Sequence, residues 1–151
     1  MRKMIGEAVK TAMKSGDKAR LSTLRMISAK IKDVDLAAQA GGKPEASEAE
    51  LAEALAKMIK QRRESIAQFK TGNRPDLVAQ EEAEIIVIGA YLPKGLSPAE
   101  STAAIDAVIK ETGAASQKDM GKVMAVLKER HAGQMDFTAA SATVKAKLAG
   151  R

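Results

Sequence analysis

The sequence predicts an all-α fold, with a larger N-terminal bundle of about four helices and a small C-terminal bundle of three. Aromatic residues make up only 2% of the 151 residues, whereas alanine and methionine, which both favour helices, are abundant. Glycine, proline and capping residues divide the chain into about seven segments with helical spacing of apolar residues. With 45% hydrophobic and 29% charged residues, the chain has the composition of a folded protein.

The first two helices are separated by a glycine. The first is expected to run from about Arg2 to Lys14 and to end at Ser15-Gly16. Asp17 is a good cap for the second helix, which continues towards Gly41-Gly42. Apolar residues at helical spacing mark the inner side of this second helix: Leu21, Leu24, Ile27, Ala29 and Ile31. The second helix therefore has one side for a core.

Two further helices complete the N-terminal bundle. Ser47–Glu50 has the form of a capping box and opens a helix that ends at Gly72-Asn73. Pro75 suits the first position of the next helix, which should run towards Tyr91. Residues 84–88 of that helix are apolar on almost every side, and alone they could form a buried strand. The preceding pattern and the lack of a partner strand favour a helix buried from two directions.

Residues 91–95, Tyr-Leu-Pro-Lys-Gly, interrupt the helical pattern. We place a domain boundary there, between an N-terminal domain of residues 1–92 and a C-terminal three-helix domain of residues 93–151. The starts of the three short helices are indicated by capping sequences at Ser97–Glu100, at Ser116–Asp119 and at Asp136. Three helices in fewer than 60 residues make a marginal core unless they dock on another surface.

Positive charge is concentrated towards the end of the third helix. Residues 57–74 contain six basic side chains and a single acid, Glu64. At about 100° per residue, one flank of this helix carries Lys60, Arg63, Lys70 and Arg74. Such a flank either is a solvated surface or binds a polyanion, and amides at the start of the next helix could also bind phosphate. The charge geometry alone does not decide between a solvated surface and a surface that binds RNA or another phosphate polymer.

Arg62 falls among the apolar residues of the same helix, where an unpaired guanidinium would be costly. We therefore predict that it forms an ion pair with an acid of the following helix, Glu81 or Glu84. These three residues are expected to be structural. If Glu81 and Glu84 do not pair with Arg62, the default interpretation is that they belong to a solvated, charged face of their helix.

The chain contains no recognisable catalytic or metal-binding set. There is no cysteine, and the only histidine, His131, is expected at the edge of the core near the end of its helix. Neither a Walker loop nor a dinucleotide-binding glycine motif is present. We therefore expect no metal, no cofactor and no catalytic residue. Enzyme activity would need an unrecognised carboxylate pair such as Glu81 and Glu84.

The N-terminal residues lack the apolar run of a signal peptide, and no window approaches the length of a membrane span. A net charge of +6 favours anionic ligands only weakly. These observations lead us to expect a cytoplasmic protein that does not contact a membrane.

Several sequence blocks resemble the signature of a known family. They are residues 61–66 (QRRESI), 72–77 (GNRPDL), 84–85 (EI), 91–93 (YLP) and 118–124 (KDMGKVM). In this order and across nearly the whole chain, they resemble YqeY-like proteins. The family includes the helical and tail region of the B subunit of the glutamine-dependent amidotransferase that amidates misacylated tRNA.

The resemblance implies a non-catalytic, tRNA-binding accessory module. Candidate RNA contacts are then Lys60, Arg63, Lys70, Arg74, Lys118 and Lys122, and candidate partners are tRNA and amidotransferase or translation-linked proteins. The family label of carbon–nitrogen ligase with glutamine as amido-N-donor would be inherited from the larger subunit. Gly121, inside a helix of the same block, is expected to serve close helix packing. The alternative is a protein-interaction adaptor that docks through the methionine-rich side of its C-terminal bundle, at Met120 and Met124.

Overall fold

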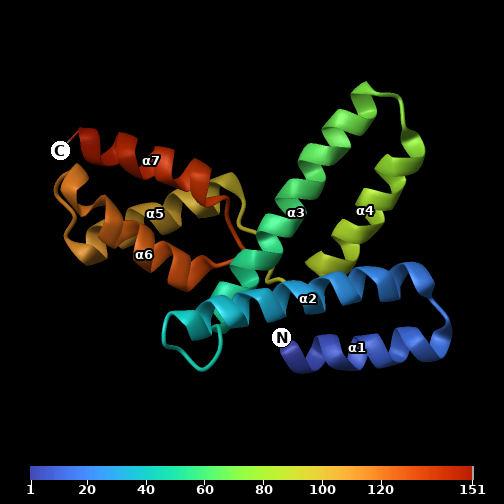
Figure 1. Cartoon of the computed structure of the whole chain (residues 1–151). Coiled ribbons are helices and arrows are strands. Elements are labelled where there is room, and N and C mark those ends of the chain that lie inside the picture. The colour runs from blue at the N-terminus through green and yellow to red at the C-terminus, as the bar shows by residue number, and fades with distance from the viewer. Residues whose placement is uncertain (151) are drawn as a thin grey trace. The chain divides into compact units, whose positions relative to one another are not determined.

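The computed structural model describes residues 1–150, and every regular element among them is a helix (Figure 1). The all-α prediction is confirmed. The elements are α1 (Arg2–Ser15), α2 (Lys18–Ala40), α3 (Glu48–Thr71), α4 (Pro75–Gly89), α5 (Pro98–Thr112), the 3-10 turn η1 (Gln117–Asp119), α6 (Met120–His131) and α7 (Phe137–Ala149). Two compact units divide the chain, one of Met1–Leu92 and one that begins at Pro93. Arg151, the last residue of the expected C-terminal domain, lies outside the described residues.

The helix starts follow from side-chain caps. The carboxylate of Asp17 accepts a hydrogen bond from the Arg20 amide at 3.1 Å, and the hydroxyl of Ser47 accepts one from the Glu50 amide at 3.1 Å. Each bond satisfies an amide that has no partner within its own helix. At Ser97 the capping box is complete, because the Glu100 carboxylate also accepts from the Ser97 amide at 3.2 Å. The capping sequences thus place the helix starts.

The expected capping box at Ser116–Asp119 opens a 3-10 turn rather than the first turn of an α-helix. The Asp119 carboxylate accepts hydrogen bonds from the amides of Ala115 at 2.9 Å and Ser116 at 3.3 Å. Helix α6 then begins at Met120. These bonds hold the pKa of Asp119 below its ordinary value, because they stabilise the charged carboxylate.

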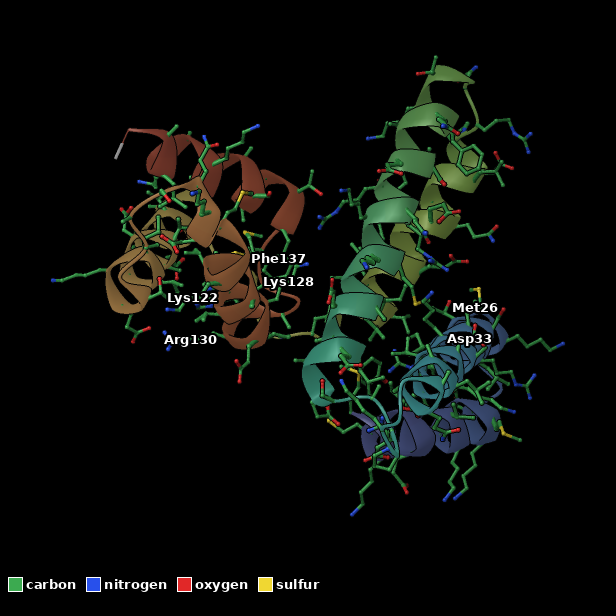
Figure 2. The ribbon with its side chains drawn as sticks, turned by 60° about the vertical axis from the view of Figure 1, so that its left-hand side comes forward. Met26, Asp33, Lys122, Lys128, Arg130 and Phe137 are labelled. Atoms are coloured by element: carbon green, nitrogen blue, oxygen red, sulfur yellow. The ribbon has the colours of Figure 1, made fainter. Side chains whose placement is uncertain are left out.

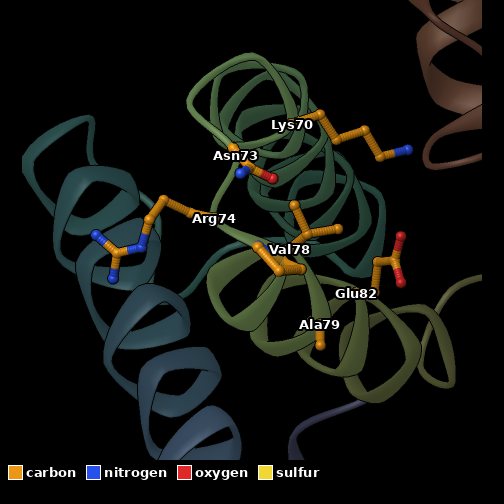
Figure 3. A pocket seen from close by; sticks show the side chains of 7 residues that line it. Lys70, Asn73, Arg74, Val78, Ala79 and Glu82 are labelled. Carbon is orange, nitrogen blue, oxygen red and sulfur yellow. The ribbon is translucent and has the colours of Figure 1, made fainter.

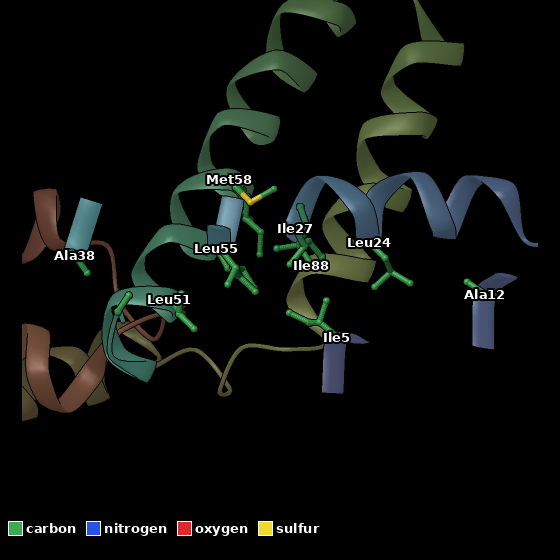
Figure 4. Close-up of a cluster of buried hydrophobic side chains, with 12 residues drawn as sticks. Ile5, Ala12, Leu24, Ile27, Ala38, Leu51, Leu55, Met58 and Ile88 are labelled. Carbon is green, nitrogen blue, oxygen red and sulfur yellow. The ribbon is translucent and has the colours of Figure 1, made fainter. Parts of the chain in front are cut away.

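The core of the N-terminal unit lies where α2 crosses the first half of α3 and the end of α4 (Figure 4). Its largest fully buried side chains are Leu24, Ile27, Leu51, Leu55 and Ile88. Helix α1 adds Ile5 and Ala12 from the other side of α2. The buried positions of α3 end at Ile66, and α4 contributes only Ile88. The far half of the α3–α4 hairpin therefore extends beyond the core.

A polar contact joins the start of α1 to the loop before α3. Arg2 donates to the Asp35 carboxylate at 2.6 Å and to the carbonyl of Ala46 at 2.8 Å. The same carboxylate accepts from the Ala46 amide at 2.8 Å. Hydrogen bonds from Arg2 and Ala46 lower the pKa of Asp35, since they favour its charged form.

The C-terminal unit has its own core, formed by one apolar side from each of its three α-helices. Its buried members are Ile105, Val108, Ile109, Ala114, Val123, Leu127, Ala140, Val144 and Leu148. Met120 and Met124 are partly buried and pack against this cluster. Gln134 ties the entry of the unit to its last loop, because its carbonyl accepts from the Leu96 amide at 2.8 Å and its side chain donates to the Lys94 carbonyl at 3.1 Å. The methionines proposed for docking are thus largely used for this unit's own packing.

Candidate functional site

Arg62 forms the ion pair that the sequence predicted. Its Nε lies 2.8 Å from a carboxylate oxygen of Glu84 and 3.8 Å from one of Glu81. One of its terminal nitrogens also donates to the Met58 carbonyl at 3.2 Å. The side chains of Arg62 and Glu84 are only 14% and 15% exposed. This pair links α3 to α4 and has a structural role.

The negative charge of Glu81, the second acid beside Arg62, is less well compensated than that of Glu84. The pKa of Glu81 is raised, first by burial and then by the neighbouring Glu84 carboxylate, while Arg62 acts in the opposite direction. Among residues 1–150 there is no group of three metal-ligating side chains that could hold a metal ion.

The four cations expected on one flank of α3 are not equivalent. Arg74 binds Asp76 through two contacts of 3.3 and 3.2 Å, so its charge is neutralised within the first turn of α4. This pairing raises the pKa of Arg74 and lowers that of Asp76. In Figure 3 the side chains of Lys70 and Glu82 extend on one side of the hairpin, whereas Arg74 extends on the other. The expectation that Arg74 shares a flank with Lys70 is therefore wrong.

Arg63 and Lys70 remain as exposed cations of α3. Neither has an ion pair within 4 Å among the residues that the structure describes. Lys60 is exposed as well. Lys70 also borders a shallow pocket of about 320 Å³ at the hairpin tip, which is lined by Asn73, Arg74, Pro75, Val78, Ala79 and Glu82. Because the pocket includes a carboxylate as well as two cations, it is not a simple anion site.

The two lysines expected to bind RNA from the C-terminal unit differ in their surroundings. Lys122 donates to the backbone carbonyl of Thr112 at 3.3 Å, which places its charge at the C-terminal end of α5. Figure 2 shows Lys122 on α6 together with Lys128 and Arg130, and Arg130 pairs with Glu111 of α5. Lys118 is exposed on the turn before α6. Lys122 thus contributes to the packing of α5 and α6.

Gly121 does not serve close helix packing. A Cβ atom added to Gly121 would meet nothing within 4 Å, and the residue is exposed in the first turn of α6. The expectation is wrong because Gly121 faces solvent rather than a neighbouring helix. His131, by contrast, is half-buried at the end of α6 with its Nδ1 3.2 Å from the side-chain oxygen of Gln134, as a core-edge residue would be.

The outward face of α4 is the main feature that the sequence did not predict. Residues 84–88 are not buried from two directions, because Ile88 is fully buried but Ile86 is 75% exposed. Ile86 shares its face with the exposed residues Ala79, Ala83 and Ala90. These four positions follow the spacing i, i+4, i+7 and i+11 of a single helical face. We call this row the α4 stripe.

The edge of the α4 stripe that adjoins α3 can be located from two contacts. A Cβ on Gly89 would lie 3.9 Å from the Ile59 side chain, and Lys70 lines a pocket with Val78 and Ala79. The two helices are therefore antiparallel, with Ile59 level with Gly89 and Lys70 level with Val78. Arg63 lies one turn beyond Ile59 along the same line of α3 and comes level with the middle of the stripe. Arg63 and Lys70 therefore border the same edge of the stripe.

The curated proteins to which the chain is similar include three from fungi, each named "Altered inheritance of mitochondria protein 41, mitochondrial". The protein of Lachancea thermotolerans is 41% identical over 67% of this chain and 51% of its own length. Those of Pyrenophora tritici-repentis and Saccharomyces cerevisiae are 33% and 31% identical over 81% and 80% of this chain, and over 68% and 63% of their own lengths. The chain thus spans about half to two thirds of the length of these relatives.

Two expectations are corrected by these names. The expected function, a tRNA-binding accessory module similar to the tail of the amidotransferase B subunit, is wrong, because the relatives are named for the inheritance of mitochondria and not for tRNA or amidation. The expected cytoplasmic location is wrong as well, since the relatives are named as mitochondrial proteins. The pairing of Arg74 and the packing role of Lys122 weaken the RNA surface independently.

No described helix is both long enough and apolar enough to cross a membrane. The names of the relatives state no catalytic activity, and the association with an amidotransferase finds no support in them. The family resemblance itself is confirmed, because the profile of the family described as "Yqey-like protein" matches residues 2–148. The chain belongs to the YqeY-like protein family.

Proposed function

We propose that this chain is a protein-interaction module that holds a partner on the α4 stripe. The observation that supports the proposal is the 75% exposure of Ile86 within a row of alanines. A single exposed apolar side chain is ordinary on a protein surface, but a continuous apolar face on a helix is typical of a docking surface. The stripe lies opposite Ile88, so the fold itself does not use it.

This location differs from that of the alternative considered from the sequence, in which the chain docks through its C-terminal bundle. Met120 and Met124 pack against the core of their own unit and therefore offer less free apolar surface than Ile86. A binding role also agrees with relatives whose name refers to a cellular process rather than to a chemical reaction. The partner of such a module would be recognised by apolar contact first, with charge adding orientation.

Site-specific photo-crosslinking in cells tests the proposal. A photo-reactive amino acid in place of Ala83, on the stripe, is expected to give an adduct with one partner segment that mass spectrometry can map. The matched control is the same replacement at Ala29, which is an exposed alanine on α2. Ile86→Asp, added to the protein that carries the photo-reactive residue at position 83, should remove the adduct. It should not lower the melting temperature, because the Ile86 side chain is exposed. Equal adducts at Ala83 and Ala29, or no protein adduct at Ala83, would overturn the proposal.

A further inference from the structure

The shape of the α4 stripe fits one kind of occupant, a helix. From Ala79 to Ala90 the stripe covers twelve residues, which rise by about 16 Å along a straight α-helix and therefore match about three turns of a partner helix. Alanine on both sides of Ile86 lets another backbone approach closely, and Ile86 can then insert between the side chains of that partner. A helix with apolar residues at i, i+4 and i+7 has the complementary face.

The charges around the stripe are unequal on its two edges. The edge next to α3 carries Arg63 and Lys70, which are seven residues apart and therefore about 10.5 Å apart along the helix. On the opposite edge the residues of α4 level with the stripe are Gln80 and Val87, and one turn before Gln80 the Asp76 carboxylate is paired with Arg74. A partner helix on the stripe would therefore meet cations without an ion pair on the α3 side, whereas the cation on the other side, Arg74, is already paired with Asp76.

One acid stands between the two cations. Glu82 extends to the same side of the hairpin as Lys70 (Figure 3), and it lies one turn along α4 from Ala79. A partner carboxylate level with Glu82 would be repelled, whereas carboxylates level with Arg63 and Lys70 would be attracted. The favourable pattern along the partner's edge is thus acid, then a neutral or basic residue, then acid.

We infer that the occupant of the α4 stripe is an acidic amphipathic helix of another protein. Its apolar side covers Ile86, and two carboxylates seven residues apart on one edge face Arg63 and Lys70. The inference rests on the proposed function and adds the chemistry of the partner. It follows from charge complementarity along one edge of an apolar face, because the charges at the opposite edge, Arg74 and Asp76, are paired with each other.

A pair of synthetic peptides tests the charge pattern with the full-length chain. Both peptides have roughly 20 residues, so that they form helices, with leucine at i, i+4 and i+7 in each repeat. One carries glutamate at the two edge positions and the other carries lysine there. Binding is measured by the fluorescence anisotropy of a label on each peptide. The glutamate peptide is expected to bind at least about tenfold more tightly than the lysine peptide, and the difference should shrink at high salt.

Charge reversal in the protein sharpens the measurement. Arg63→Glu combined with Lys70→Glu should reverse the preference between the two peptides. The matched control is Lys3→Glu combined with Lys14→Glu, two exposed lysines on α1, which should leave both affinities unchanged. Ile86→Asp should weaken both peptides alike, because it removes the apolar contact that they share.

The outcomes separate this inference from the proposed function. Equal binding of both peptides, lost in Ile86→Asp, would overturn the acidic partner and leave docking on the stripe intact. Failure of the glutamate peptide to bind, or a segment mapped from Ala83 that is basic, would likewise overturn the inference. An Ala83 adduct to a second copy of the chain would identify the stripe as a self-association surface and would overturn it too. Absence of any protein adduct at Ala83 would remove the proposed function itself.

Discussion

The two units of this chain differ in how completely they bury their apolar side chains. Among residues 1–150 the large exposed hydrophobic side chains are Met4, Met13, Met26, Leu36 and Ile86, and all five belong to the N-terminal unit. In the C-terminal unit the apolar residues of the three helices pack on a common core, methionines included. The smaller unit, expected to be marginal, thus leaves less apolar surface open than the larger one. This difference supports the N-terminal unit, rather than the C-terminal one, as the site of the docking that we propose.

The largest effect should come from the two isoleucines of α4 that lie on opposite sides. Ile88→Ala removes a fully buried side chain and should lower the free energy of unfolding of the N-terminal unit by about 2 to 4 kcal/mol. Ile86→Ala should change it by less than about 0.5 kcal/mol, because that side chain is exposed. Urea titration followed by circular dichroism measures both. Similar losses in the two variants would mean that Ile86 is covered in the folded protein.

The next effect concerns the ion pair that joins α3 to α4. Arg62→Ala leaves two partly buried carboxylates without their counter-charge and should cost about 2 to 3 kcal/mol. Glu84→Ala should cost less, because Arg62 keeps Glu81 at 3.8 Å and the Met58 carbonyl. Since the residues share one contact, the double variant should cost less than the sum of the two single ones. Additive losses in a double-mutant cycle would show that the pair does not couple the helices.

A smaller and opposite effect is expected in the C-terminal unit. Gly121→Ala should raise its stability by up to about 1 kcal/mol, because alanine favours the helix and the added methyl group enters open space. Thermal unfolding of the variant measures the gain. A loss of stability would mean that a neighbouring group approaches Gly121 closely, as the sequence-based interpretation held.

The smallest effect concerns pH. The pKa of Asp35 is lowered in the folded state, so the contribution of its carboxylate is present above the ordinary value of about 4 and is lost as pH falls through the lowered value. Asp35→Asn should be less stable at neutral pH and should lose less stability on acidification. Melting temperatures from pH 7 down to about pH 2 test this. Parallel pH profiles for the two proteins would show that the Arg2–Asp35 contact does not depend on charge.

The sequence was sufficient for those features that depend on local chemistry. The caps at Asp17 and Ser97 place helix starts because the bonds they make lie within a few residues. The pairing of Arg62 was also predictable, since an unpaired guanidinium on an apolar face has few alternatives. Even the Arg74–Asp76 pair, two residues apart, could have been found from the sequence, had the acid at the start of the next helix been considered.

Features that depend on the placement of whole helices were not predictable. The run Ile85–Ile88 shows that four apolar residues are adjacent, but not whether a second element covers the far side of the helix. The contact between Lys122 and the Thr112 carbonyl depends on the turn between α5 and α6, which no local pattern specifies. Gly121 was interpreted as a packing glycine for the same reason, since the sequence around it does not tell which side of α6 faces solvent.

The way in which buried positions end along the α3–α4 hairpin has a consequence for dynamics. Beyond Ile66 on α3, and before Ile88 on α4, no side chain of either helix is buried. The turn around Gly72 can therefore open by local unfolding while the core at the base of the hairpin stays intact. Amide protons near the tip should exchange with solvent well before those of Leu51 and Leu55. A helix bound to the hairpin would slow that exchange even at residues that it does not touch. Amide exchange near the tip would therefore report binding spectroscopically.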